Sequence, residues 1–283
     1  MSKSKERIRD SQLRYKQGLG QNFIYDDDLL SAIAEASGVT EEDDVVEIGP
    51  GSGTLTKHLC RRAHAVMSVE LDERLIPILR VSMEHEENFT LVEGDALSMN
   101  YGELTRALRH PYSVVANIPY YITTPLIMRL LEEKDSLHRI AVMVQKEVAD
   151  KILSSPGDEG WGMLAVKCQY YCEPFLAMDV PASCFTPVPK VDSAFVVMPV
   201  RRERAVRVQS EEDFFRIAQA AFALRRKTMT NGLCAALHLE RDAAVSLMEQ
   251  AGLDTKVRGE KLTLEELGRL ADAWTQRKAE ENA

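Results

Sequence analysis

A glycine-rich turn between an apolar run and a helix-like segment constrains this chain most. Residues 45–48 have the apolar character of a buried strand, and residues 54–59 resume with helical periodicity. Between them stand Gly49, Gly51 and Gly53, in a turn too tight for side chains. A strand therefore leads into a helix through bare backbone, which lets a ligand lie against main-chain N–H groups. The alternative interpretation is a plain strand-to-helix turn.

The spacing of these glycines indicates which ligand the turn would hold. Dinucleotide-binding folds have the pattern G-x-G-x-x-G, which lets pyrophosphate reach the helix. Here the glycines alternate with other residues, and the acidic Glu47 comes shortly before them. Because a carboxylate repels phosphate and attracts a cation, the loop disfavours a nicotinamide cofactor and favours the sulfonium of S-adenosylmethionine. We therefore expect Glu47, Gly49 and Gly51 to contact S-adenosylmethionine.

Further apolar runs alternate with helix-like segments after this turn. Strands are expected over residues 65–70, 89–93, 113–117, 139–144 and 194–198, with helices over 72–81, 102–108 and 124–131. The alternation predicts right-handed crossovers and a largely parallel sheet. The predicted fold class is therefore α/β, with a Rossmann-like sheet.

Several of these strands end in polar residues. Glu70 ends the second strand, where a carboxylate can accept hydrogen bonds from both hydroxyls of a ribose. Asp95 and Ala96 follow the third strand, which places Asp95 to meet the exocyclic amine of an adenine ring. Because the carboxyl ends of parallel strands meet at one edge of the sheet, a carboxylate for the ribose, a second for the base and the backbone of the glycine turn for the methionine part together suit S-adenosylmethionine. Simple exposure also makes strand ends polar, and that alternative stays open.

The fourth strand ends in Asn117-Ile118-Pro119-Tyr120, the candidate catalytic segment. Methyl transfer to an exocyclic amine is difficult because the nitrogen lone pair is delocalised into the ring. The Asn117 side-chain oxygen and a backbone carbonyl held open by Pro119 could each accept one N–H, while Tyr120 stacks on the base. Positioning and electrostatic complementarity would then supply most of the rate. An ordinary strand-terminating turn is the alternative.

Two loops have features of ligand contact. Gln21 and Asn22 lie in a segment that is a poor helix, where their amides could contact a ligand or merely precede a helix. Phe185 lies on a loop made rigid by Pro187 and Pro189. Its ring could form the second face of a base sandwich, and a buried core phenylalanine is the competing interpretation.

The net charge of −9 argues mildly against a nucleic-acid partner, because phosphate binding needs a cationic surface. Basic residues nevertheless cluster within residues 3–16, within 201–207 and at Arg225-Arg226-Lys227. The last cluster separates two predicted helices, so it is either a phosphate contact or a solvated turn.

The five cysteines are odd in number and scattered, so reduced thiols are expected. Cys168 and Cys172 lie in an apolar, strand-like run over residues 163–172, which favours core thiols over a metal site. No run reaches the length of a membrane span and the N-terminus has no apolar segment, so we predict a cytoplasmic protein without a membrane partner.

After residue 201 the pattern becomes helical only. Helices are expected over residues 211–224, 227–237, 241–250 and 263–274. We therefore predict two domains, an S-adenosylmethionine-binding methyltransferase domain over residues 1–204 and a helical domain over residues 205–283.

Taken together, these features resemble the KsgA/RsmA family of ribosomal RNA small-subunit adenine dimethyltransferases. The resemblance covers nearly the whole chain and rests on residues 19–23, 47–56, 70, 94–96, 117–120, 185–193 and 225–228. It implies a class I methyltransferase fold, with a mostly parallel seven-stranded sheet and a small all-α C-terminal domain. It also implies dimethylation of N6 of two adjacent adenosines in the 3′-terminal hairpin of 16S rRNA, within an assembling small subunit.

The resemblance also implies roles for single residues. The cofactor contacts would be Asn22, Ile24, Gly49, Glu70, Asp95 and Asn117. Asn117, Pro119 and Tyr120 would hold the target amine, with Phe185 on the base, and the protein is expected to be a monomer.

Two other functions stay open. A 23S rRNA adenine methyltransferase of the resistance type shares the motifs at 117–120 and 185–189, although residues 19–23 and 49–53 look like the small-subunit branch. A non-catalytic binding factor on the same fold is the second, and the presence of Glu70, Asp95 and Asn117 argues against a loss of chemistry.

Overall fold

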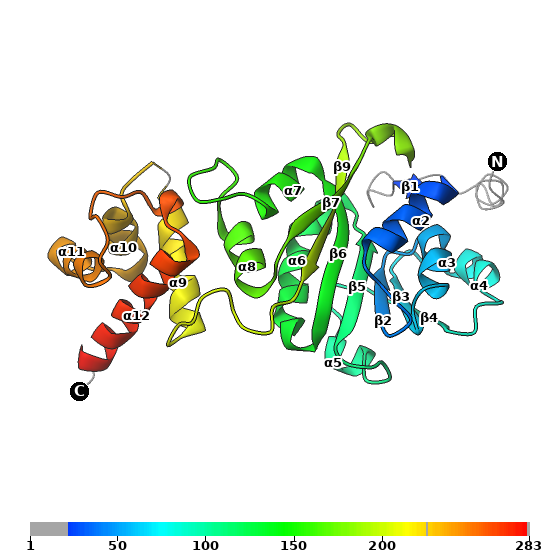
Figure 1. The fold of residues 1–283 in the computed structure, drawn as a ribbon, viewed down its shortest axis with the longest axis horizontal. Helices are drawn as coiled ribbons and strands as arrows, with labels where there is room; N and C mark the ends of the chain where they lie inside the picture. Colours follow the sequence, from blue (N-terminus) through cyan, green and yellow to red (C-terminus); the bar gives the residue numbers. More distant parts are fainter. Residues whose placement is uncertain (1–21, 225, 282–283) are drawn as a thin grey trace. The chain divides into compact units, whose positions relative to one another are not determined.

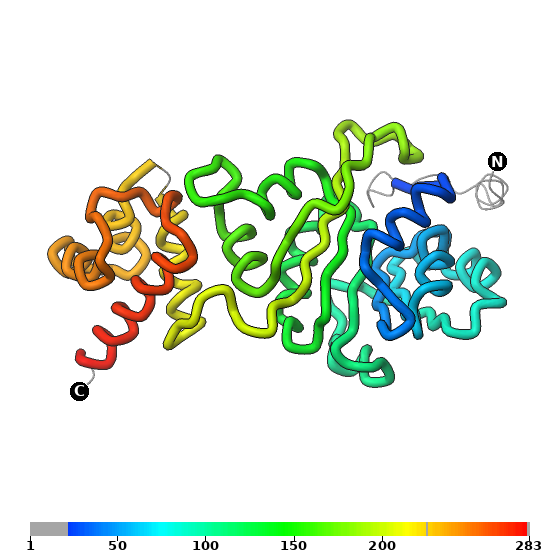
Figure 2. Tube along the Cα trace, in the orientation of Figure 1, coloured from blue at the N-terminus to red at the C-terminus, as the bar shows by residue number. Residues whose placement is uncertain are grey.

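A computed structural model describes residues 22–224 and 226–281 of the chain (Figure 1). The chain forms two compact units. The first comprises the described residues up to Ala149 together with Glu173–Val200, and the second comprises Asp150–Cys172 and the described residues from Arg201 onward. Figure 2 traces this path. The chain leaves the first unit after Ala149, returns to it over Glu173–Val200 and then ends in the second unit.

The first unit is built on a seven-stranded sheet in the order β4-β3-β2-β5-β6-β9-β7. Neighbouring strands run parallel from β4 to β6, whereas β9 is antiparallel to both β6 and β7. The strands are β2 (Asp44–Ile48), β3 (Ala65–Glu70), β4 (Phe89–Glu93), β5 (Tyr112–Asn117), β6 (Leu137–Gln145), β7 (Phe175–Val180) and β9 (Ser193–Pro199). The α/β class and the predicted strands are thus confirmed. Strand β7 was not predicted, because at the sheet edge only Val180 of its residues is buried.

Helices connect the parallel strands, as predicted: α3 (Thr54–Cys60), α4 (Ile76–Ser82), α5 (Tyr101–Leu104) and α6 (Thr123–Leu130). Helix α2 (Asp27–Ala36) precedes the first of these strands, and α7 (Lys146–Ile152) follows the last. Helix α4 begins later than the predicted residue 72 because Pro77 occupies its first turn, where a missing N–H costs nothing. Three 3₁₀ turns complete the connections: η2 (Tyr120–Ile122), η3 (Leu131–Ser136) and η4 (Ala182–Cys184).

A second, two-stranded sheet lies beside the glycine-rich loop. Its strands β1 (Phe23–Ile24) and β8 (Phe185–Thr186) are antiparallel, with Ile24 opposite Phe185. This pairing was not predicted, because a strand of two residues has no readable periodicity. It ties the segment after Asn22 to the proline-containing loop.

The second unit is helical. It contains α8 (Met163–Tyr171), α9 (Glu211–Ala223), α10 (Met229–Leu237), α11 (Arg241–Gln250), η5 (Gly259–Lys261) and α12 (Leu264–Glu281). The four helices predicted after residue 201 are therefore present. Every helix among the described residues is too short or too polar to span a bilayer.

Helix α8 corrects the strand-like interpretation of residues 163–172, which was wrong. Side chains from several faces of α8 are buried, so the run has no helical periodicity to read. The Tyr170 ring stacks on Phe214 of α9 with centroids 4.6 Å apart, which ties α8 to the second unit. Residues 150–172, expected within the first domain, therefore pack with the helical one. Cys168 and Cys172 are buried, as expected of core thiols.

Candidate active site

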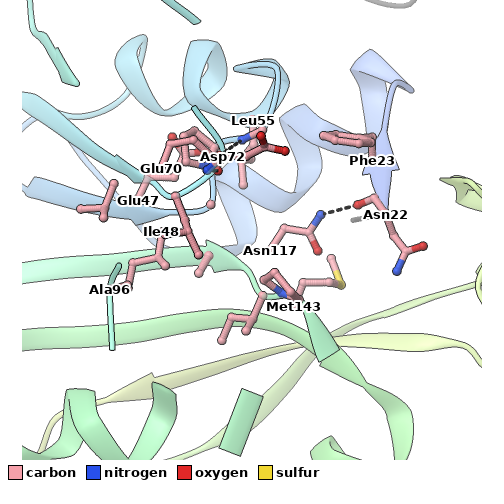
Figure 3. Close-up of a pocket in the computed structure, with 18 of the residues that line it drawn as sticks. Asn22, Phe23, Glu47, Ile48, Leu55, Glu70, Asp72, Ala96, Asn117 and Met143 are labelled. Carbon is pink, nitrogen blue, oxygen red and sulfur yellow. Dashed lines mark hydrogen bonds between the residues drawn. The ribbon is translucent and has the colours of Figure 1, made fainter. Parts of the chain in front are cut away.

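One pocket of the first unit lies at the carboxyl edge of the sheet, where β2, β3, β4 and β5 end (Figure 3). It contains about 1150 Å³ of empty space, its open mouth included. Most of the predicted site residues line it: Asn22, Ile24, Glu47, Gly49, Gly51, Glu70, Asp95, Ala96, Asn117, Pro119 and Tyr120. They come together because parallel neighbours deliver their last residues to the same edge.

The remaining predicted residues are not among the described residues that line this pocket. Gln21 and Arg225 fall outside the described residues. Phe185 is absent from the pocket lining and only 1% exposed, packed in the core cluster as its competing interpretation predicts. Arg226 and Lys227 are exposed in the second unit, in the turn between α9 and α10.

The glycine loop shapes one wall of the pocket. Gly49, Gly51 and Gly53 have φ values of 71°, 60° and 79°, in the left-handed region that favours glycine. A Cβ on Gly51 would lie 2.7 Å from Cε1 of Phe23, so a side chain there would displace that ring. The tight turn is thus confirmed as a steric requirement.

The N–H groups of these glycines are used within the protein. They donate to Val69 O at 3.0 Å, to Glu70 Oε2 at 3.1 Å and to Pro50 O at 3.0 Å, respectively. The expectation that the loop offers N–H groups to a ligand therefore does not hold for its glycines. Their contribution is space for a close approach and a fixed position for Glu70.

Glu70 is held at both carboxylate oxygens. Oε2 accepts from Gly51 N, and Oε1 accepts from Asp72 N at 2.8 Å. Figure 3 shows Glu70 and Asp72 beside each other. Burial raises the pKa of Glu70, and these two N–H groups oppose the shift. Since each carboxylate oxygen has a further lone pair, both can still accept from hydroxyl groups in the pocket.

Glu47 is buried beneath the loop. Its Oε2 accepts from Thr56 Oγ1 at 2.7 Å and from Ser68 Oγ at 2.6 Å. Burial raises the pKa of Glu47 to about 7; the two hydroxyls oppose the shift and the charge of Glu70 adds to it. Two carboxylates in one buried wall favour a cation in the pocket.

Asn117 is oriented by a single hydrogen bond. Its Nδ2 donates to Asn22 O at 3.0 Å, which points the amide oxygen in the other direction (Figure 3). Within the described part of the chain, no hydrogen bond reaches Asn117 Oδ1 or the neighbouring Ile118 O. The carbonyl of Pro119, by contrast, accepts from Ile122 N at 3.1 Å. Asn117 Oδ1 and Ile118 O are therefore the acceptors that this segment offers.

Asp72 was missed by the sequence reasoning. It lines the pocket, is buried and is clamped by Arg74, whose Nε donates to Oδ1 at 2.8 Å. The signal was available, since Asp72 follows Glu70 by two residues at the same strand end. Apolar lining residues such as Met143 and Phe195 had no such signal, because core positions have the same character.

The fold and this pocket define a class of protein. A Rossmann-like sheet with buried acids at the ends of β2 and β3, and an Asn-x-Pro-Tyr segment after β5, is the arrangement of a class I methyltransferase acting on an amine. The model of the family described as ribosomal RNA adenine dimethylase matches residues 12–276. The chain therefore belongs to the ribosomal RNA adenine dimethylase family.

Two curated relatives match along nearly the whole chain. The ribosomal RNA small subunit methyltransferase A of Clostridium botulinum (strain Okra / Type B1) is 42% identical over 269 residues, covering 95% of this chain and 97% of the relative. The protein of the same description from Enterococcus faecalis (strain ATCC 700802 / V583) is 39% identical over 283 residues, covering 98% and 96%.

Two solved structures share the fold. A dimethyladenosine transferase from Plasmodium falciparum superposes with a TM-score of 0.77 at 22% identity, covering 90% of this chain and 98% of its own. The 23S rRNA methyltransferase ErmE superposes with a TM-score of 0.71 at 28% identity, covering 90% and 100%.

The raised pKa of Glu47 predicts a pH-dependent stability. Glu47 has a higher pKa in the folded chain than in the unfolded chain, so its ionisation destabilises the folded state. The contribution of Glu47 to the free energy of unfolding is therefore complete below about pH 4.5 and is lost as the pH rises to about 7. Glu47→Gln stays neutral throughout. From pH 5 to pH 8, the free energy of unfolding of wild type should fall by about 2 to 3 kcal/mol relative to Glu47→Gln in urea titrations.

Glu93→Gln, at the exposed end of β4, is the control and should follow the wild-type pH dependence. Parallel curves for wild type and Glu47→Gln would contradict the burial of a carboxyl with a raised pKa.

Proposed function

We propose that this protein uses S-adenosylmethionine to dimethylate N6 of two adjacent adenosines in the 3′-terminal hairpin of 16S rRNA during small-subunit assembly, as a cytoplasmic monomer. The main support for the proposal is that one pocket contains both buried carboxylates and the acceptor oxygen Asn117 Oδ1, which points away from Asn22. The curated relatives support the small-subunit branch, since they are 42% and 39% identical whereas the 23S enzyme is 28% identical.

The residues present fit S-adenosylmethionine. Glu70 has lone pairs for two ribose hydroxyls. Asp95 accepts from Leu97 N through Oδ1 at 2.9 Å, which orients the side chain and leaves Oδ2 for an adenine amine. Glu47 and Glu70 supply negative potential for a sulfonium. When bound, the cofactor supplies a methyl group made electrophilic by its positively charged sulfur.

The catalytic work of the protein is to orient the target amine. Asn117 Oδ1 and Ile118 O would each accept one N–H, which localises the nitrogen lone pair away from the ring. Tyr120 would stack on the base and hold it against the pocket. No strong base is needed, because the amine loses its proton readily once it has become an ammonium. After the first methyl transfer the amine keeps one N–H, so a single acceptor can orient the amine for the second methyl transfer.

The turn between α9 and α10 is the proposed phosphate contact of the helical domain. In the other described basic cluster, Arg204 forms an ion pair with Glu211 at 3.0 Å and Arg207 forms one with Glu203 at 2.7 Å, so these two arginines are largely neutralised by neighbours. Arg226 and Lys227 are exposed, and among the described residues no ion pair engages them. Together with Arg225 they would give an acidic protein a local site for RNA phosphates.

Asn117→Ala should abolish turnover while leaving cofactor affinity within about twofold, because the lost oxygen contacts the target amine. The measurements are calorimetric binding of S-adenosylmethionine and nucleoside mass analysis of treated small subunits. Asn100→Ala removes an amide outside the pocket and is the matched control, with activity expected to match wild type. Methylation by Asn117→Ala near the wild-type rate would contradict the assignment.

Replacing Arg225, Arg226 and Lys227 with glutamine should weaken particle binding and reduce the slope of log affinity against log salt by roughly 2. The slope falls because fewer counterions are released when fewer phosphates are neutralised. Arg207→Gln, which removes an arginine already paired with Glu203, should leave the slope unchanged. An unchanged slope in the triple variant would mean that the cluster is only a solvated turn.

A further inference from the structure

The proline-containing loop that ends at β9 has no role in the site as proposed, because Phe185 packs in the core. Ser193, the first residue of β9 directly after this loop, does contact the site through Tyr120. Ser193 is fully buried, and its Oγ shares a 2.8 Å hydrogen bond with the hydroxyl of Tyr120. This hydrogen bond joins two segments that lie far apart in the sequence and that were both singled out by their motifs.

Ser193 is held firmly in place. It begins β9, where it lies opposite Gln145 of β6 on one side and Val180 of β7 on the other. The preceding Asp192 is also fixed, since its carbonyl accepts from Lys146 N at 3.0 Å and its Oδ1 accepts from Ala182 N at 2.8 Å. The serine hydroxyl is therefore a rigid anchor.

Tyr120 needs such an anchor. It begins η2, a single 3₁₀ turn of three residues, in which the backbone hydrogen-bond geometry is poorer than in an α-helix. Its ring lines the pocket, whereas its hydroxyl is turned to Ser193. Burial raises the pKa of Tyr120, so the phenol keeps its proton and the hydrogen bond persists at neutral pH.

We propose that Ser193 is a positioning residue for methyl transfer, which holds the ring of Tyr120 in the orientation that receives the target adenine. It acts through Tyr120 and touches neither cofactor nor RNA. This inference rests on the proposed stacking role of Tyr120. It gives the loop between β8 and β9 a function, since the loop delivers a fixed hydroxyl to the catalytic segment.

The test is a double-mutant cycle of Ser193→Ala and Tyr120→Phe in the full chain. Each variant loses the same hydrogen bond and keeps the ring, so each should lower kcat on undermethylated small subunits about tenfold, with S-adenosylmethionine affinity unchanged. The double variant should be no slower than the slower single variant, because the two changes remove one interaction.

Ser113→Ala is the matched control. Ser113 is also fully buried on a strand of the same sheet, and its hydroxyl donates to Asp43 Oδ1 at 2.9 Å, away from the pocket lining. The Ser113→Ala variant should be destabilised about as much as Ser193→Ala, but it should keep the wild-type kcat. A loss of kcat in Ser193→Ala alone thus separates positioning from a general effect on folding.

Tyr120→Ala distinguishes the two levels of the proposal. If Tyr120→Ala is inactive but Ser193→Ala has wild-type kcat, the positioning role of Ser193 is overturned and the role of Tyr120 stands. If Tyr120→Ala is fully active, the proposed stacking itself is overturned. Multiplicative losses in the double variant would show that the two residues act separately, which also overturns the positioning role.

Discussion

The site depends on the hydrogen bond between the Gly51 N–H and the buried carboxylate of Glu70. It joins the end of β3 to the loop that follows β2, so that one contact sets both the shape of the glycine turn and the orientation of the acid. The parallel pairing of β2 with β3 places Glu47 opposite Ser68, which then donates to it. Two carboxylates are thereby buried in one wall, where hydroxyl and N–H groups of the described residues offset part of their desolvation. A cation in the pocket would relieve more of that cost, which is why this wall suits the proposed sulfonium cofactor.

The catalytic segment is positioned from the opposite side by elements that lie outside the parallel part of the sheet. Asn117 ends β5, but the orientation of its amide comes from Asn22, immediately before β1. Strand β1 is in turn held by β8, and the loop after β8 leads to Ser193 and its contact with Tyr120. The proposed acceptors for the target amine are thus arranged by two segments that lie far apart in the sequence, one at Asn22 and one at Ser193.

Much of this arrangement could be predicted from sequence, for a physical reason. The parallel strands are buried runs bounded by glycine and polar residues, so the positions of Glu70, Asp95 and Asn117 at one edge follow from topology alone. What could not be predicted depends on tertiary packing. Residues 163–172 look like a strand because α8 is buried on several faces, and Phe185 cannot be told from a ligand-stacking ring until its partners in the core are known. The Tyr120–Ser193 hydrogen bond likewise requires the fold.

The pocket is proposed to methylate adenosine in small-subunit RNA. The most direct measurement is methyl transfer from labelled S-adenosylmethionine to undermethylated small and large ribosomal subunits in parallel, followed by nucleoside mass analysis. We expect N6,N6-dimethyladenosine to be confined to the small-subunit RNA. Label in the large subunit, or binding to the small subunit without label, would contradict it.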